Sequence, residues 1–105
     1  MSSPEKPRRI VLSPRARQDF IDILRYTGEH WGQGQLHTYR DKLNEALQTL
    51  AVNPLMGRRS GELPETHRLH RVGSHVIVDR NHDGTPAVVR VLHQRMQLAA
   101  HIQGS

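Results

Sequence analysis

The chain has 105 residues, a length that suits one compact domain with one small hydrophobic core. Lys and Arg outnumber Asp and Glu by 15 to 10, and the resulting formal net charge of +5 favours an acidic partner, either a nucleic acid or an acidic protein segment. Cysteine is absent, which excludes disulfides and thiolate zinc sites, and no apolar run approaches the roughly 20 residues that span a bilayer.

The amino-terminal residues 1–7 are rich in Ser, Pro and charged side chains, and they predict a flexible arm. Residues 1–9 lack the apolar middle of a signal peptide, so we expect a cytoplasmic protein. A single domain is expected over residues 8–102, followed by a frayed end at residues 103–105.

Residues 8–12 end in three apolar side chains and predict a short buried strand. Ser13 and Pro14 then mark a helix start, because the Ser hydroxyl can accept an amide hydrogen bond and Pro is tolerated at the first helical position. Apolar residues recur at spacings of three and four along this helix, which we expect to end at Gly32. The stripe consists of Ala16, Phe20, Ile23, Leu24, Thr27 and Trp31.

A second stripe of the same period follows the glycine-containing break at residues 32–34 and predicts a second helix that ends at Asn53, before a proline. Two amphipathic helices joined by a few residues form a helical hairpin. We expect Trp31 and Tyr39 to pack in the core near its tip. The second stripe consists of Leu36, Tyr39, Leu43, Ala46, Leu47, Leu50 and Ala51.

The last third of the chain changes to short runs rich in Val, Ile and Leu. A loop over residues 55–66 contains Gly and Pro, and we expect it to be exposed. The runs at residues 67–72, 75–80 and 87–93 are separated by turn-forming residues and predict an antiparallel meander. The predicted fold class is therefore α+β in the order β-α-α-β-β-β, a helical hairpin packed on a small antiparallel sheet, with a final helical turn in residues 95–102.

Four segments, in this order, resemble the RelE/ParE toxin superfamily and its ParE branch in particular. They are LSPRARQDFIDILRYTGEHWG at residues 12–32, LAVNPLMGR at 50–58, HRLHRVGSHVIVDR at 67–80 and VVRVLHQRMQL at 88–98. The resemblance implies a RelE/ParE-like fold and a toxin of a type II toxin–antitoxin system that inhibits DNA gyrase and blocks replication. It also implies a cognate antitoxin, which holds the toxin inactive and binds the operator DNA.

The chain departs from that family on the third strand, where many relatives carry Phe-Tyr before an Arg. Here Val78 and Asp79 precede Arg80. An acid at this position argues against an aromatic contact from the strand. We expect the Asp79 carboxylate to pair instead with Arg80 or with a neighbouring His.

The predicted target-binding residues lie in the loop after the second helix and at the end of the last strand. Both segments are basic and expected to be exposed, which suits an acidic or nucleic-acid partner. The set is Arg58, Arg59, Arg90, His93, Gln94, Arg95 and Met96. The ParE resemblance implies action by binding, so no catalytic residue and no cofactor is predicted. No metal is predicted either, because two residues on one strand face, His75 and Asp79, do not make a site.

Two other functions stay open at this stage. In a ribosome-dependent mRNA endoribonuclease of the RelE branch, Arg90, His93 and Arg95 would supply acid–base and phosphate-binding groups, although Arg90 and His93 are three apart in a strand and should face opposite sides. Further candidates for that chemistry are His67, Arg68, His70 and Arg71. The chain could also be an inactive or repurposed basic binding module, in which the cations of the amino-terminal arm contact DNA phosphates.

Overall fold

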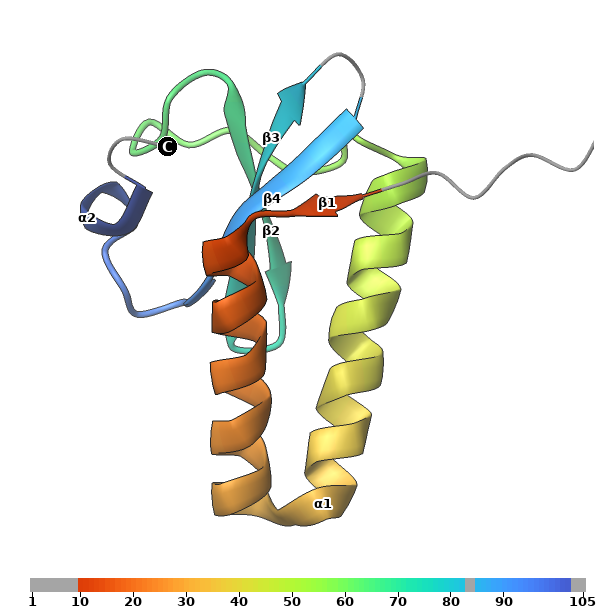
Figure 1. The fold of residues 1–105 in the computed structure, drawn as a ribbon. Coiled ribbons are helices and arrows are strands. Elements are labelled where there is room, and N and C mark those ends of the chain that lie inside the picture. Colours follow the sequence, from red (N-terminus) through yellow and green to blue (C-terminus); the bar gives the residue numbers. More distant parts are fainter. Residues whose placement is uncertain (1–9, 83–84, 103–105) are drawn as a thin grey trace, which may run out of the picture.

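The computed structural model describes residues 10–82 and 85–102, so the arm predicted at residues 1–7 and the frayed end at 103–105 lie outside the described residues. A bent helical hairpin lies on one side of a small sheet, and a short helix lies on the other (Figure 1). The elements in chain order are β1 (Val11–Leu12), α1 (Pro14–Val52), β2 (His67–Val72), β3 (His75–His82), β4 (Thr85–His93) and α2 (Leu98–Ile102).

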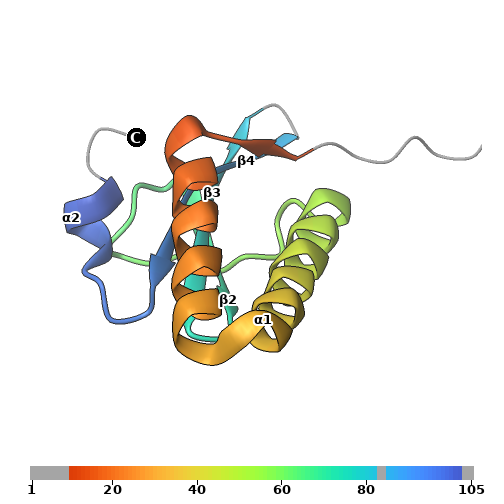
Figure 2. The same ribbon diagram turned by 60° about the horizontal axis from the view of Figure 1, so that its bottom comes forward.

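Helix α1 begins where the sequence predicts. The Ser13 hydroxyl accepts the Ala16 N–H at 3.0 Å and donates to the Val89 carbonyl oxygen at 2.9 Å, so the same side chain caps the helix and ties it to β4. At Gly32 the backbone leaves the helical region, with φ 88° and ψ 172°, a conformation that suits Gly. There the chain reverses, and the two arms of α1 lie side by side (Figures 1 and 2).

The predicted order β-α-α-β-β-β is therefore not reproduced element for element. Where two helices were expected, α1 is assigned as one element of 39 residues, although non-helical backbone at Gly32 separates its two arms at the predicted break. α2 lies within residues 95–102, where a final helical turn was predicted. The mixed α+β class is confirmed.

The sheet has the strand order β1-β4-β3-β2. The meander of β2, β3 and β4 is antiparallel, as predicted, but β1 runs parallel to β4, with Val11 beside Ala87 and Leu12 beside Val88. The prediction of an all-antiparallel sheet was wrong for this strand. The direction of a strand depends on which strand it pairs with in the fold, and the pairing of the two-residue β1 with β4 has no signal in the sequence.

The two faces of the sheet carry separate hydrophobic clusters, because successive side chains of a strand point to opposite sides. On β3, Ile77 belongs to the cluster under α1, and its neighbours Val76 and Val78 belong to the cluster on the other face. That second cluster also contains Leu63 and Ile102. The prediction that residues 55–66 form an exposed loop is therefore wrong at Leu63, which is buried.

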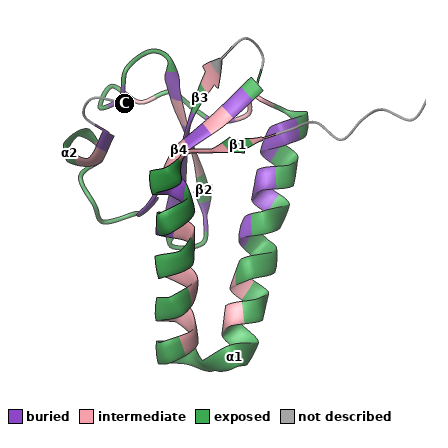
Figure 3. Ribbon diagram, in the orientation of Figure 1, coloured by how far each residue is buried: buried purple, intermediate pink, exposed green. Residues whose placement is uncertain are grey.

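The far end of the α1 hairpin extends beyond the sheet, and none of residues 20–42 is buried (Figure 3). Trp31 is 69% exposed, so the expectation that it packs in the core was wrong. The amphipathic stripe predicts which side of a helix faces inward, but it does not predict where the sheet beneath it stops. Tyr39, closer to the sheet, is partly buried and donates its hydroxyl proton to the Val72 carbonyl oxygen at 3.1 Å.

Asp79 is fully buried, with 0% of its surface exposed, on the face of β3 that packs under α1. Its neighbours across the sheet are Arg68 and Val88. Neither carboxylate oxygen has a hydrogen-bond partner among the described residues, so the expected pairing with Arg80 or a His was wrong. Adjacent strand residues face opposite sides, which carries the Arg80 side chain away from Asp79. Burial raises the pKa of Asp79 to about 6, although nearby Arg68 acts in the opposite direction.

Removing the Asp79 charge should stabilise the protein near neutral pH. With a pKa of about 6 in the folded chain and 3.8 as the ordinary value, the folded state loses stability relative to the unfolded state as the pH rises from about 4 to about 6. We expect Asp79→Asn to raise the free energy of unfolding by about 2 kcal/mol at about pH 7.5, and the gain to vanish at about pH 4. Urea unfolding of both proteins across this range measures the difference, with the exposed Glu29→Gln as the control. An equal gain at both pH values would contradict it.

Candidate functional site

Arg90, one of the predicted target-binding residues, is held in an ion pair with Asp19 of α1. Its Nε donates to Asp19 Oδ2 at 2.7 Å and its Nη2 donates to Oδ1 at 3.2 Å. A third donor, Nη1, reaches the carbonyl oxygen of His101 at 3.1 Å. Both charged side chains are nearly buried, at 11% and 9% exposure. Arg90 is therefore occupied in joining α1, β4 and α2.

Asp19 also completes the hydrogen bonding of the sheet. Strand β1 pairs with β4 only at Ala87 and Val88, so the Val91 amide lies beyond the last residue pair of these two strands. Asp19 Oδ2 accepts that amide, the N–H of Val91, at 3.0 Å. The carboxylate thus takes the place of a strand partner, and Arg15 lies 3.9 Å from its other oxygen.

A cationic hollow of about 330 Å³, here called the basic pocket, lies on the sheet face opposite α1. Its floor is formed by Leu69 of β2 and Val76 of β3, which belong to the cluster on that face. The loop after α1 forms one wall, and the turn that leads into α2 forms the other. Further lining residues are Arg58, Arg59, Ser60, Glu62, Arg71, Gln94, Met96 and Leu98.

The loop that carries Arg58 and Arg59 is fixed to the edge of the sheet. Arg58 and Leu69 exchange two backbone hydrogen bonds, each of 2.9 Å. Beside them, a Cβ on Gly57 would lie 3.0 Å from both the Cβ of Arg68 and the carbonyl oxygen of Leu69. Only glycine allows the loop to lie this close to β2 without a shift. The Arg68 guanidinium also donates to the Gly57 carbonyl oxygen at 3.0 Å, so the arginine pair projects from an anchored segment.

His93 lies in a different hollow of about 370 Å³, here called the aromatic pocket, which also contains His75, Tyr39 and Trp31. The His75 and His93 rings meet edge to face, with centroids 5.4 Å apart. Burial, followed by the neighbouring His93, lowers the pKa of His75 to about 4, so this ring is neutral near pH 7. Because the Tyr39 hydroxyl donates to Val72, we assign the ring proton of His75 to Nδ1, which donates to the Tyr39 oxygen.

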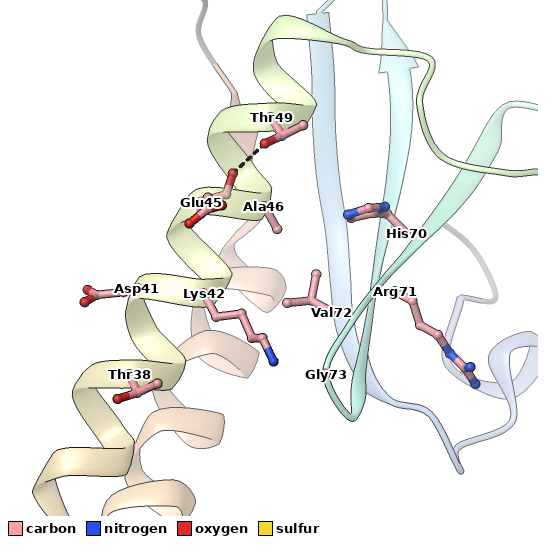
Figure 4. Close-up of a pocket in the computed structure, with 10 residues that line it drawn as sticks. All are labelled: Thr38, Asp41, Lys42, Glu45, Ala46, Thr49, His70, Arg71, Val72 and Gly73. Atoms are coloured by element: carbon pink, nitrogen blue, oxygen red, sulfur yellow. Dashed lines mark hydrogen bonds between the residues drawn. The ribbon is translucent and has the colours of Figure 1, made fainter.

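A third concavity, the α1–β2 groove, lies between the second arm of α1 and the edge strand β2 (Figure 4). It measures about 530 Å³ and combines apolar side chains with both signs of charge. Its helix side is formed by Thr38, Asp41, Lys42, Glu45, Ala46 and Thr49, and its strand side by His70, Arg71, Val72 and Gly73. Arg71 points away from α1 in this view (Figure 4), and it lines the basic pocket as well.

Comparison with known proteins identifies the family. The family model described as "ParE toxin of type II toxin-antitoxin system, parDE" matches residues 10–98. The chain belongs to the ParE toxin family. It is 38% identical to Toxin ParE1 of Mycobacterium tuberculosis over 91 residues, which cover 86% of this chain and 93% of that protein. It is 36% identical to Toxin ParE1 of Caulobacter vibrioides over 97 residues, which cover 92% and 98%.

The fold has a counterpart among solved structures. A chain of the chromosomal ParDE TA system from P. aeruginosa superposes with a TM-score of 0.67 at 16% identity, covering 80% of this chain and 95% of that one. Toxin ParE of Escherichia coli is a further relative, 32% identical over 93 residues, which cover 88% of this chain and 90% of that protein.

In this ParE protein the predicted target-binding residues do not form one site. The structure brings four of them to the basic pocket: Arg58, Arg59, Gln94 and Met96. Arg90 is paired with Asp19, and His93 lines the aromatic pocket on the other side of the sheet. Arg95 is exposed, and its backbone N–H donates to His93 Nδ1 at 3.1 Å.

The sequence interpretation missed Asp19 and the link between Tyr39 and His75. Asp19 carries a signal in hindsight, since it lies three residues after Ala16 and one before Phe20, on the flank of an apolar stripe. If a carboxylate in that position is buried, it needs a cation beside it. The Tyr39–His75 contact joins residues 36 apart and has no comparable signal. Within the described residues, no group of three or more His, Asp or Glu side chains is arranged to hold a metal ion.

The Asp19–Arg90 pair can be tested by double substitution. We expect Asp19→Asn alone to lower the free energy of unfolding by about 3 kcal/mol, because it leaves a nearly buried guanidinium without its counter-charge. Asp19→Asn combined with Arg90→Gln should recover part of this loss, since the amide can still accept the Val91 N–H. Urea unfolding of wild type, both single variants and the double variant gives the coupling energy. Strictly additive losses would show that the two charges act independently.

Proposed function

We propose that this toxin inhibits DNA gyrase by binding it, and that a cognate antitoxin neutralises the toxin. Membership of the ParE family over residues 10–98 is the observation that carries the proposal. The basic pocket supports it further, because it gathers Arg58, Arg59, Gln94 and Met96 into one exposed patch on anchored backbone. We assign target contact to this pocket.

The nuclease alternative has less support from the geometry. Its three proposed residues would have to converge on one phosphate. Arg90 instead donates three hydrogen bonds to Asp19 and a backbone carbonyl, and His93 faces the aromatic pocket. An action by binding needs no such convergence, which favours a toxin that is not an enzyme.

We propose that the toxin works in the cytoplasm, where bacterial gyrase and DNA are found. Among the helices that the structure describes, none combines the length and apolar character needed to cross a membrane.

The α1–β2 groove is the site that we assign to the antitoxin. Its apolar side chains Ala46 and Val72 offer area for burial, and Lys42, Glu45 and Asp41 provide charges of both signs. β2 is the edge strand, and among the described residues a single isolated bridge, from Arg58 to Leu69, covers its outer side. A peptide segment can therefore lie between the helix and the strand edge.

Loss of the exposed arginine pair should weaken gyrase inhibition. We expect Arg58→Gln/Arg59→Gln to raise the toxin concentration that halves supercoiling by about tenfold, or about 1.4 kcal/mol of binding. The measurement is supercoiling of relaxed plasmid by gyrase over a toxin titration. Arg17→Gln/Arg25→Gln, which removes the same charge from an exposed part of α1, should change inhibition little.

A different result would redirect the proposal. If wild-type toxin leaves supercoiling intact and cleaves messenger RNA on ribosomes, the function is that of a RelE-type nuclease and the gyrase proposal fails. If the protein arrests neither replication nor translation in cells, the chain is an inactive or repurposed member of the family.

Blocking the groove should release the toxin from its antitoxin. Thr49 is exposed and lines the groove, whereas the adjacent Gln48 is exposed and does not. We expect Thr49→Trp to weaken antitoxin binding by about tenfold because the indole fills the groove, while Gln48→Trp binds normally. Calorimetry with the purified cognate antitoxin measures this. Equal affinity of both variants would place the antitoxin elsewhere.

A further inference from the structure

Among the described residues, three arginines of the basic pocket have no carboxylate partner. Arg58, Arg59 and Arg71 are exposed. The Arg–carboxylate ion pairs found among the described residues involve other arginines. Glu62 is the one carboxylate among the lining residues, and it lies beyond ion-pair distance of all three. The pocket therefore presents an excess of two positive charges to the solvent.

The backbone that carries these arginines is fixed before any ligand arrives. Arg58 is bridged to Leu69, and Gly57 lets the loop lie directly on β2. Arg71 belongs to β2 itself and is paired in register with Val76. Because the backbone is already fixed, binding a ligand through these cations costs less conformational entropy.

The pocket differs in character from the α1–β2 groove. The groove mixes two carboxylates with its cations, which suits a protein segment of alternating charge. The basic pocket has arginines, the amide of Gln94 and the hydroxyl of Ser60 around an apolar floor. Guanidinium forks with neutral donors are the groups that bind phosphate oxygens, and an apolar floor accommodates the sugar between two phosphates.

We propose that the basic pocket binds the phosphodiester backbone of DNA. The inference rests on the proposed function, because it means that the toxin contacts both gyrase and the DNA bound to gyrase. Arg58, Arg59 and Arg71 contact phosphate oxygens, and Gln94 and Ser60 donate to the same backbone. Contacts of this kind carry no base sequence information, so binding is independent of sequence and weakens steeply with salt.

The test measures DNA binding without gyrase. Fluorescence anisotropy of a labelled 20-base-pair duplex is recorded over a series of salt concentrations for wild type and for Arg58→Gln/Arg59→Gln/Arg71→Gln. We expect the triple variant to bind at least tenfold more weakly. Its plot of log affinity against log salt should be shallower by about 0.9 for each phosphate that the variant no longer neutralises. Thermal unfolding of each variant checks that it is folded.

The matched control removes three exposed arginines of α1 in the variant Arg17→Gln/Arg25→Gln/Arg40→Gln. It carries the same change of net charge, and we expect its affinity to fall by less than about threefold and its salt slope to stay unchanged. Equal decreases in the two triple variants would overturn the inference, because net charge alone would then explain them. Retained DNA binding by the pocket variant, combined with a failure to bind the antitoxin, would also overturn it and make the pocket a protein site.

Two comparisons separate this inference from the proposed function. If the pocket variant loses gyrase inhibition but keeps its DNA affinity and salt slope, the DNA inference fails and gyrase inhibition stands. If wild type binds DNA through the pocket and does not inhibit gyrase, the inference stands and the proposed function fails. A labelled RNA of the same sequence that is bound through the pocket and cleaved would assign the site to RNA and overturn the DNA inference.

Discussion

The carboxylate of Asp19 joins the helical layer to the sheet, and the rest of the molecule is arranged around that joint. It accepts two hydrogen bonds from the Arg90 guanidinium and a third from the Val91 amide. The third bond is needed because β1 is two residues long and leaves the edge of β4 open beyond Val88. A buried ion pair adds little net stability compared with apolar packing, but its geometry allows few alternatives. It therefore fixes where the first arm of α1 lies along β4.

That joint explains the unequal roles of the two arms. The first arm is fixed mainly at its start, by the Ser13 cap and by Asp19, and its other buried residue is Ala16. The second arm supplies most of the helical side of the core, through Leu43, Ala46, Leu47, Leu50 and Ala51. The tip reaches past the sheet and leaves Trp31 in solvent. With a core of this size and a buried Asp79 that has no partner among the described residues, stability should be modest, and a bound partner raises it by mass action.

The sequence predicts those features that depend on short-range periodicity. Strand β2 was predicted at its observed bounds, β3 began at its observed first residue, and the stripe from Leu43 to Ala51 is buried as expected. The helix start at Ser13-Pro14 follows from capping chemistry that is local to a few residues. Each of these signals lies within one element, so no knowledge of the tertiary arrangement is needed to read it.

The features that could not be predicted depend on contacts between distant residues. In the sequence, nothing distinguishes Arg90 from a free surface cation. In the fold, Asp19, 71 residues earlier in the chain, lies beside it and accepts its hydrogen bonds. From the sequence Asp79 is expected to be a paired acid, yet strand alternation turns Arg80 away, and the carboxylate is fully buried without a hydrogen-bond partner among the described residues. The gathering of Arg58 and Arg59 with Gln94 and Met96 likewise requires the loop after α1 to bridge to Leu69, which only the buried Gly57 permits.

Arg71 connects the two proposed partner surfaces, since it lines both the α1–β2 groove and the basic pocket. It lies on the edge strand β2 with its side chain pointing away from α1 (Figure 4), so a peptide in the groove would reach the guanidinium only across the strand edge. A carboxylate of such a peptide within salt-bridge distance would neutralise one of the three unpaired arginines that face the pocket. The two sites open on opposite sides of β2, but both use the Arg71 guanidinium. Binding at the groove would therefore weaken binding at the basic pocket. Under these proposed assignments, an antitoxin in the groove weakens target contact without covering Arg58 or Arg59.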